Sequence, residues 1–144
     1  MNTFLKENFF KLLIGSSILI LSIAVLIYIV TATQTPPSAN DKIIGEPIKI
    51  ADIEVAEYDF PEYMNWDNAL KACKALGSGW RLPTTRELDL LYRNKDEIGS
   101  FAPEYYWSSN FFDVNSSWRY NFHGGFQAEA NKGFGSNVRA VRSF

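Results

Sequence analysis

Cysteine and histidine are nearly absent from this chain, and each scarcity excludes a class of protein. The sequence holds one cysteine, Cys73, and one histidine, His123. A single cysteine cannot close an intramolecular disulfide, so the folded part of the chain must hold its core without one. No cluster of cysteines and histidines has the spacing of metal ligands. The sequence therefore predicts neither a disulfide-framed domain nor a metal site.

A surplus of positive charge and the groups of a catalytic site are missing as well. The net charge is −2 at pH 7, whereas nucleic-acid-binding domains are usually strongly basic, so we predict no nucleic-acid partner. Nothing in the sequence pairs His123 with a nucleophile and an orienting acid, and no glycine-rich phosphate loop precedes a helix. Glu87 and Asp89 stand two positions apart on an expected helix and therefore face different directions. We predict a protein that is not an enzyme and needs no cofactor.

Charged residues are missing from one long apolar segment, Leu12–Val30. As a helix it covers roughly 28 Å, about the thickness of the hydrocarbon core of a bilayer. A buried helix of a soluble domain would show a polar stripe. Two interpretations remain, an uncleaved transmembrane helix or signal-anchor and a secretory signal peptide cleaved after Ala32. The run exceeds the ~7–15 apolar residues of a typical signal peptide, which favours the anchor.

The basic residues around this run predict its orientation. Lysines precede the run, and the next basic residue after it is Lys42. We therefore expect residues 1–11 in the cytoplasm and the rest of the chain exported, to the periplasm or the cell surface. Residues 31–46 are polar, contain Pro-Pro and show no apolar period, which predicts a flexible tether. Residues 47–144 are then the folded domain.

The domain begins with an expected strand and a well-punctuated helix. Alternating apolar residues predict a strand within Ala51–Phe60. Asn65 is a suitable N-cap for the helix and Gly77 a suitable left-handed residue after its end. The apolar residues at helical spacing between them are Trp66, Ala69, Leu70, Cys73 and Leu76. On this face Cys73 is expected to be a small buried hydrophobe and not a reactive thiol.

The stretch "GSGWRLPTTRELDLLY" then predicts a corner that locks this helix to a second one. Thr84 and Glu87 have the spacing of a capping box, in which hydroxyl and carboxylate satisfy the first amides of a helix. We expect Trp80 and Leu82 to enter the core while Arg81 faces an acidic partner or a carbonyl. The buried stripe of the second helix is predicted to be Leu88, Leu91 and Tyr92.

The remaining third of the chain reads as short strands joined by turns. The predicted strands are Tyr105–Ser109, Ser117–Phe122, Phe126–Ala130 and Asn137–Phe144. Gly124 and Gly125 suit a hairpin turn because glycine accepts positive φ, and His123 is then an exposed turn residue. Trp107, Trp118 and Tyr120 are expected to fill the core. Helices followed by an antiparallel meander predict an α+β fold.

Three segments carry a resemblance to a known family. They are "NWDNALKACKALGSGWRLPTTRELDLLY", "YYWSS" and "NVRAVRSF", in this order. The chain resembles exported bacterial domains of the DUF1566 type, which include the C-terminal domain of a Legionella collagen-like adhesin. These are similar to the C-type-lectin-like fold shared with formylglycine-generating enzymes. The resemblance implies two helices packed on a twisted antiparallel sheet, termini that lie close together, and a variable loop region available for ligands.

Some family chemistry does not carry over to this chain. Calcium-dependent lectins of this fold use Glu-Pro-Asn or Gln-Pro-Asp and then Trp-Asn-Asp, and these tripeptides are missing here. A calcium site needs several convergent oxygen ligands, which the sequence does not supply. Formylglycine-generating enzymes need a cysteine pair, which Cys73 cannot provide alone.

Binding is the function that the sequence favours. The polar, aromatic-bearing segments between the expected strands offer groups that hydrogen-bond sugars or peptides and flat apolar faces. The predicted ligand-binding residues are Asn110, Phe111, Phe112, Asp113, Asn115, Gln127, Asn131 and Lys132. We predict a membrane-anchored, adhesin-like module that recognises a glycan or a surface protein. The alternative is a structural or docking subunit of a bacterial envelope or surface assembly.

Two arrangements of these residues would distinguish the alternatives. One exposed apolar patch of Phe111, Phe112 and Phe126 would favour protein docking. A concave cleft lined by Asn115, Gln127 and Asn131 would favour sugar binding.

Overall fold

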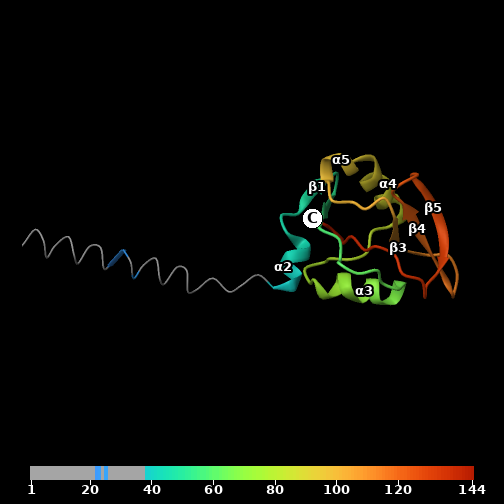
Figure 1. Ribbon diagram of the computed structural model, residues 1–144, viewed down its shortest axis with the longest axis horizontal. Helices are drawn as coiled ribbons and strands as arrows, with labels where there is room; N and C mark the ends of the chain where they lie inside the picture. Colours follow the sequence, from blue (N-terminus) through green and yellow to red (C-terminus); the bar gives the residue numbers. More distant parts are fainter. Residues whose placement is uncertain (1–21, 24, 26–37) are drawn as a thin grey trace, which may run out of the picture. The chain divides into compact units, whose positions relative to one another are not determined.

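A computed structural model describes residues 22, 23, 25 and 38–144 of the chain (Figure 1). The helices of residues 38–144 are α2 (Ala39–Ile44), α3 (Trp66–Ala75), α4 (Thr85–Arg93) and α5 (Lys95–Ile98). The strands are β1 (Ile48–Ile50), β2 (Ile53–Val55), β3 (Tyr105–Phe111), β4 (Ser116–Asn121), β5 (Phe126–Asn131) and β6 (Val141–Ser143). Helices and antiparallel strands mix along the chain, so the predicted α+β class is confirmed.

The strands form two small sheets where one was expected. One three-stranded sheet has the order β1-β2-β6, and the other has the order β3-β4-β5. In the first sheet Val55 pairs with Ile48 on one side and with Val141 on the other. The start and the end of the folded domain therefore lie side by side, with β1 near the C-terminus (Figure 1).

The helices α3 and α4 lie on opposite sides of the fold and not together on one face (Figure 1). Two adjacent residues of β3 explain this arrangement, because successive side chains of a strand point to opposite faces. Tyr106 packs in a cluster with Leu88 of α4, whereas Trp107 packs in a second cluster with Cys73 of α3. All four side chains are fully buried. Strand β3 therefore joins two hydrophobic clusters, each covered by its own helix.

The corner between α3 and α4 is confirmed in detail. Trp80 and Leu82 are buried, and the Thr84–Glu87 capping box is present. The Arg81 guanidinium donates to both carboxylate oxygens of Glu87, at 2.9 and 2.7 Å. Burial raises the pKa of the Glu87 carboxyl, but the hydrogen bonds from Arg81 and Thr84 outweigh it, and the net pKa lies below its ordinary value. The cap of α3 by Asn65 and the positive φ of Gly77 are also as predicted.

The expected tether is wrong from Ser38 onward. Ser38 and Asp41 form a capping box that starts α2, although this helix contains no regular apolar period. The Asn40 side chain donates to the Ala75 carbonyl at 3.1 Å, and Ile43 and Ile44 pack against the cluster around Cys73. Tertiary contacts with α3 therefore order a segment whose local sequence favours a flexible chain.

Two strand predictions were too long. Ala51 adopts a positive φ of 53°, which turns the chain between β1 and β2 and limits the strand predicted within residues 51–60 to Ile53–Val55. The last predicted strand, residues 137–144, is regular only over β6. Trp118 is half-buried and does not fill the core as expected.

The predicted membrane segment 12–30 lies outside the described residues, apart from residues 22, 23 and 25. Among the residues that the structure describes, no helix has the length and apolar character needed to cross a bilayer.

Candidate functional site

Three exposed apolar side chains gather where β3 ends and the turn to β4 begins. We call residues 111–114 the aromatic tip. Phe111 is 68% exposed, Phe112 50% and Val114 88%. Phe112 contacts Trp118 of β4 edge to face, with ring centroids 5.2 Å apart. The tip therefore presents three large apolar groups to solvent at one place.

The backbone of the aromatic tip is fixed by polar contacts. The Lys132 ammonium donates to the carbonyls of Asp113 and Val114, each at 3.0 Å, and also lies 4.8 Å from the Trp66 ring centroid. The Asp113 carboxylate accepts hydrogen bonds from two backbone amides that follow it in the chain. Asp113 and Lys132 therefore shape the loop, and their charged groups are engaged within the protein.

The other predicted ligand-binding residues divide into two groups. The Asn110 side chain accepts a hydrogen bond from the Thr85 amide at 2.8 Å and so caps α4. The Asn131 side chain accepts from the Gly133 amide at 2.8 Å and forms the next turn. Asn115 and Gln127 are exposed. Asn110 and Asn131 thus have local structural partners, whereas Asn115 and Gln127 face solvent.

The strand register does not bring together all the residues of either predicted arrangement: it separates Phe126 from Phe111, and Gln127 from Asn131. Ser117 of β4 pairs with Phe111 on one side and Ala130 on the other, whereas Phe126 pairs with Asn121. Residues 126 and 130 are roughly 13 Å apart along an extended strand. Phe126 therefore does not join the aromatic tip and contacts Tyr105 instead. Asn115, Gln127 and Asn131 line none of the four hollows described within residues 38–144.

A polar groove lies instead between α3 and the glycine-rich turn after β5, and the sequence analysis missed it. Its volume is about 590 Å³. Tyr63, at 63% exposed, provides an aromatic surface, and Asn68 and Lys71 of α3 line the groove. A Cβ atom on Gly135 would stand 3.0 Å from that of Tyr63, so the glycine lets the turn approach the ring. The spacing of Asn68 and Lys71 on one helix face was the available sequence signal.

A network of buried charge was also missed. Arg139 is fully buried, and its Nε donates to the Asp59 carboxylate at 2.6 Å. The Tyr106 hydroxyl donates to the other oxygen of Asp59, also at 2.6 Å. Burial raises the pKa of the Asp59 carboxyl, although Arg139 opposes this effect. Burial also raises the pKa of the Tyr106 hydroxyl, and the neighbouring Asp59 carboxylate raises it further. We call these three side chains the Arg139 network.

The described residues contain no group of three or more histidine, cysteine, aspartate or glutamate side chains placed to hold a metal ion. Cys73 is buried, and burial raises the pKa of its thiol to about 12, so the thiolate nucleophile is suppressed near neutral pH. This agrees with the prediction of a buried hydrophobe.

Comparison with protein-family models shows to which family the chain belongs. The family model of the Lcl C-terminal domain matches residues 31–142. The chain belongs to this family. The Lcl C-terminal domain described here is also similar to solved structures of the C-type-lectin-like fold. Botrocetin is 13% identical with a TM-score of 0.52, over 77% of this chain and 100% of that one.

Botrocetin in complex with a mutant von Willebrand factor A1 domain gives the same identity and coverage and a TM-score of 0.50. At this identity the likeness shows that the Lcl C-terminal domain shares the fold, as the resemblance implied. The comparison with curated proteins gave no match.

Proposed function

We propose that this Lcl C-terminal domain is an adhesin-like binding module, without catalysis, that recognises a protein surface through its aromatic tip. The observation that carries the proposal is the exposure of Phe111, Phe112 and Val114 on a loop whose backbone Lys132 holds in place. Exposed clusters of large apolar side chains mark interaction sites. A loop that is already ordered loses little conformational entropy on binding.

The solved complex supports protein recognition by a scaffold of this kind. Botrocetin, which has a similar fold, is seen bound to a von Willebrand factor A1 domain. The adhesion proposed for this chain rests on its own tip, because the sequences share only 13% identity.

We further propose that the chain is anchored in a membrane through residues 12–30 and exposes the domain in the periplasm or at the cell surface. The uncharged apolar run and the lysines before it support this proposal. In the alternative role, as a docking subunit of an envelope assembly, the domain would use the same tip. The two roles differ in where the binding partner resides.

Site-specific photo-crosslinking from position 114 in intact cells tests the proposal. We expect one discrete protein adduct, and we expect Phe111→Ser with Phe112→Ser to abolish it. Phe144→Ser is the matched control because Phe144 is 67% exposed but lies after β6. Loss of the adduct in the control, or an adduct unaffected by the tip variants, would contradict recognition through the tip. If the crosslinked protein came from the same cell envelope, the result would favour the role as a docking subunit.

The polar groove supports a glycan as a second candidate ligand. Sugars bind to open sites that combine an aromatic face with hydrogen-bonding groups, and Tyr63, Asn68 and Lys71 provide both. A glycan array with the full chain in detergent tests this candidate. We expect Tyr63→Ala to weaken saturable binding at least about 10-fold, the effect of losing ~1.4 kcal/mol. Tyr58→Ala, in a different hollow, should leave binding unchanged.

A further inference from the structure

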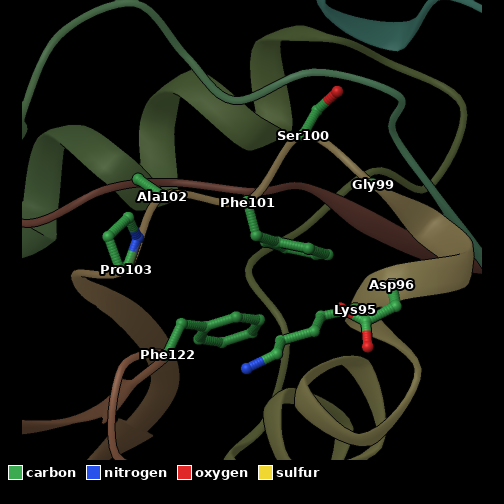
Figure 2. A pocket seen from close by; sticks show the side chains of 8 residues that line it. All are labelled: Lys95, Asp96, Gly99, Ser100, Phe101, Ala102, Pro103 and Phe122. Carbon is green, nitrogen blue, oxygen red and sulfur yellow. The ribbon is translucent and has the colours of Figure 1, made fainter.

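A smaller hollow of about 400 Å³ lies away from both proposed surfaces, between α5 and the segment that leads into β3 (Figure 2). Its wall includes Phe101 and Phe122, and its rim includes Lys95, Asp96 and Ser100. A volume of this size lies within the range of small-molecule sites. Neither the aromatic tip nor the polar groove contributes a residue to it.

The wall of this pocket is held from behind by the Arg139 network. Arg139 Nη2 donates to the Ser100 carbonyl at 2.6 Å, and its guanidinium carbon lies 4.0 Å from the Phe101 ring centroid. The Tyr106 hydroxyl accepts a hydrogen bond from the Ala102 amide at 2.7 Å. Buried, satisfied polar contacts thus fix three successive residues of the wall, so the pocket exists before any ligand binds.

The rim contains a strained residue. Gly99 and Ser100 both have positive φ, of 75° and 58°. Glycine adopts this conformation freely, but serine does so at a cost. Strain of this kind persists where the surrounding structure imposes it, and it is concentrated at ligand sites. Here it places the exposed Ser100 side chain at the rim of the pocket.

The inner surface is aromatic. The rings of Phe101 and Phe122 have centroids 4.6 Å apart and are tilted by 30°. Figure 2 shows the two rings one above the other, with the Lys95 ammonium beside Phe122. Phe101 is partly exposed, whereas Phe122 is buried behind it. A flat or bulky apolar group entering the pocket would meet the Phe101 ring on this side and charged groups at the rim.

The rim carries one positive and one negative group. The Lys95 ammonium lies 4.4 Å from the Tyr92 ring centroid, and it forms no ion pair with any residue in 38–144. Asp96, the next residue, forms no ion pair with a described residue either. A ligand with a single charge would meet attraction from one group and repulsion from the other. A zwitterion satisfies both.

We propose that this pocket binds a free α-amino acid with an aromatic or large aliphatic side chain. Its carboxylate pairs with Lys95, its ammonium group pairs with Asp96, and its side chain packs against the partly exposed ring of Phe101, which Phe122 supports from within. The site is independent of the function proposed for the aromatic tip.

Titration of the isotope-labelled full chain in detergent micelles tests this assignment. The probes are L-phenylalanine, 3-phenylpropionate, which lacks the ammonium group, and phenethylamine, which lacks the carboxylate. We expect L-phenylalanine to shift the amide resonances of residues 99–102 saturably, and each single-charge analogue to bind at least about 10-fold more weakly.

Variants identify the groups responsible. Lys95→Met keeps an apolar stem of similar length and removes the charge that lies over Tyr92, and Asp96→Asn removes the opposite charge. Each should weaken L-phenylalanine binding about 10-fold or more, whereas Lys71→Met, on α3, should leave it unchanged. Phe111→Ser should also leave it unchanged, which separates this site from the aromatic tip.

Three results would overturn the proposal. They are no saturable shift at millimolar L-phenylalanine, equal affinity for all three probes, and full affinity in both charge variants. Equal affinity would indicate that the rings take up any apolar molecule and that the rim charges recognise nothing.

Discussion

The Arg139 network buries a charged side chain, whereas the aromatic tip exposes large apolar ones, and both placements are unusual in a folded domain. Arg139 is a charged side chain with no exposed surface, whereas Phe111 is an apolar side chain that is 68% exposed. The buried charge is satisfied by Asp59 and by backbone carbonyls, so it binds distant segments together. The Phe111 ring lies 5.7 Å from the Lys132 ammonium, measured to its centroid, and stays mostly exposed. We infer that the network stabilises the fold, while the tip retains apolar surface for a partner.

Removing the buried charge gives the largest expected effect. Arg139→Met removes the guanidinium that donates to the Asp59 carboxylate and to the carbonyls of Ala56, Glu57 and Ser100, and leaves Tyr106 as the remaining donor to Asp59. We expect a loss of about 3–5 kcal/mol in the free energy of unfolding, measured by urea denaturation. Arg142→Met is the control, because its pair with Glu54 is partly exposed and should contribute about 1 kcal/mol or less. Equal losses in the two variants would contradict the role given to the network.

A smaller effect is expected at the base of the tip. Asn110→Ala removes the side-chain acceptor of the Thr85 amide at the start of α4. The expected cost is about 1 kcal/mol, as for other helix caps. Asn115→Ala, in the turn that follows β3, should leave the unfolding free energy unchanged because its side chain is exposed. If Asn110→Ala instead weakened crosslinking at position 114 without loss of stability, Asn110 would belong to the binding surface.

The Glu87 carboxylate makes part of the corner depend on pH. Its folded-state pKa lies below the ordinary value of 4.5, so its ionised form stabilises the fold above that pH and the contribution is lost as pH falls through the folded-state value. Glu87→Gln keeps a hydrogen-bonding capping residue but removes the charge. We expect the variant to be less stable by about 1 kcal/mol or less at pH 7. Thermal denaturation should show this difference shrinking below pH 4.5, and a constant difference down to pH 3 would refute it.

The smallest effect on stability is expected where the proposed effect on binding is largest. Phe111→Ser should change the free energy of unfolding by no more than about 0.5 kcal/mol, because the side chain is mostly exposed. Chemical denaturation measures this change, and the crosslink from position 114 measures binding on the same protein. A loss above 2 kcal/mol would show that the ring packs within the fold and would undo the contrast with Arg139.

Local signals in the sequence predicted the parts of the fold that local physics determines. Asn65, Thr84 and Glu87 cap helices through partners three residues away, so their roles follow from spacing alone. The burial of Trp80, Leu82 and Cys73 follows from their place in amphipathic patterns. The adjacent pair Phe111 and Phe112 was predicted to bind a ligand, with one ring expected to point outward, and both rings are exposed.

The same reasoning could not assign the roles of the polar loop residues. Asn110, Asp113 and Lys132 resemble ligand-binding residues in sequence, yet their side chains hydrogen-bond within the domain. Sequence composition does not distinguish a side chain that binds a partner from one that shapes a loop, because both need the same chemistry. The polar groove was missed for a related reason, since its two walls come from α3 and from a distant turn.

The sequence by itself determined the α+β class, the caps and buried faces of α3 and α4, and the corner between them, because each depends on residues within a few positions. Only the tertiary structure decided that the strands divide into two sheets, that α2 is ordered and that Arg139 is buried. Arg139 and Asp59 lie 80 positions apart, and Val55 pairs with Val141 across the whole domain. Such pairings depend on how the complete chain closes on itself, and no local pattern records them.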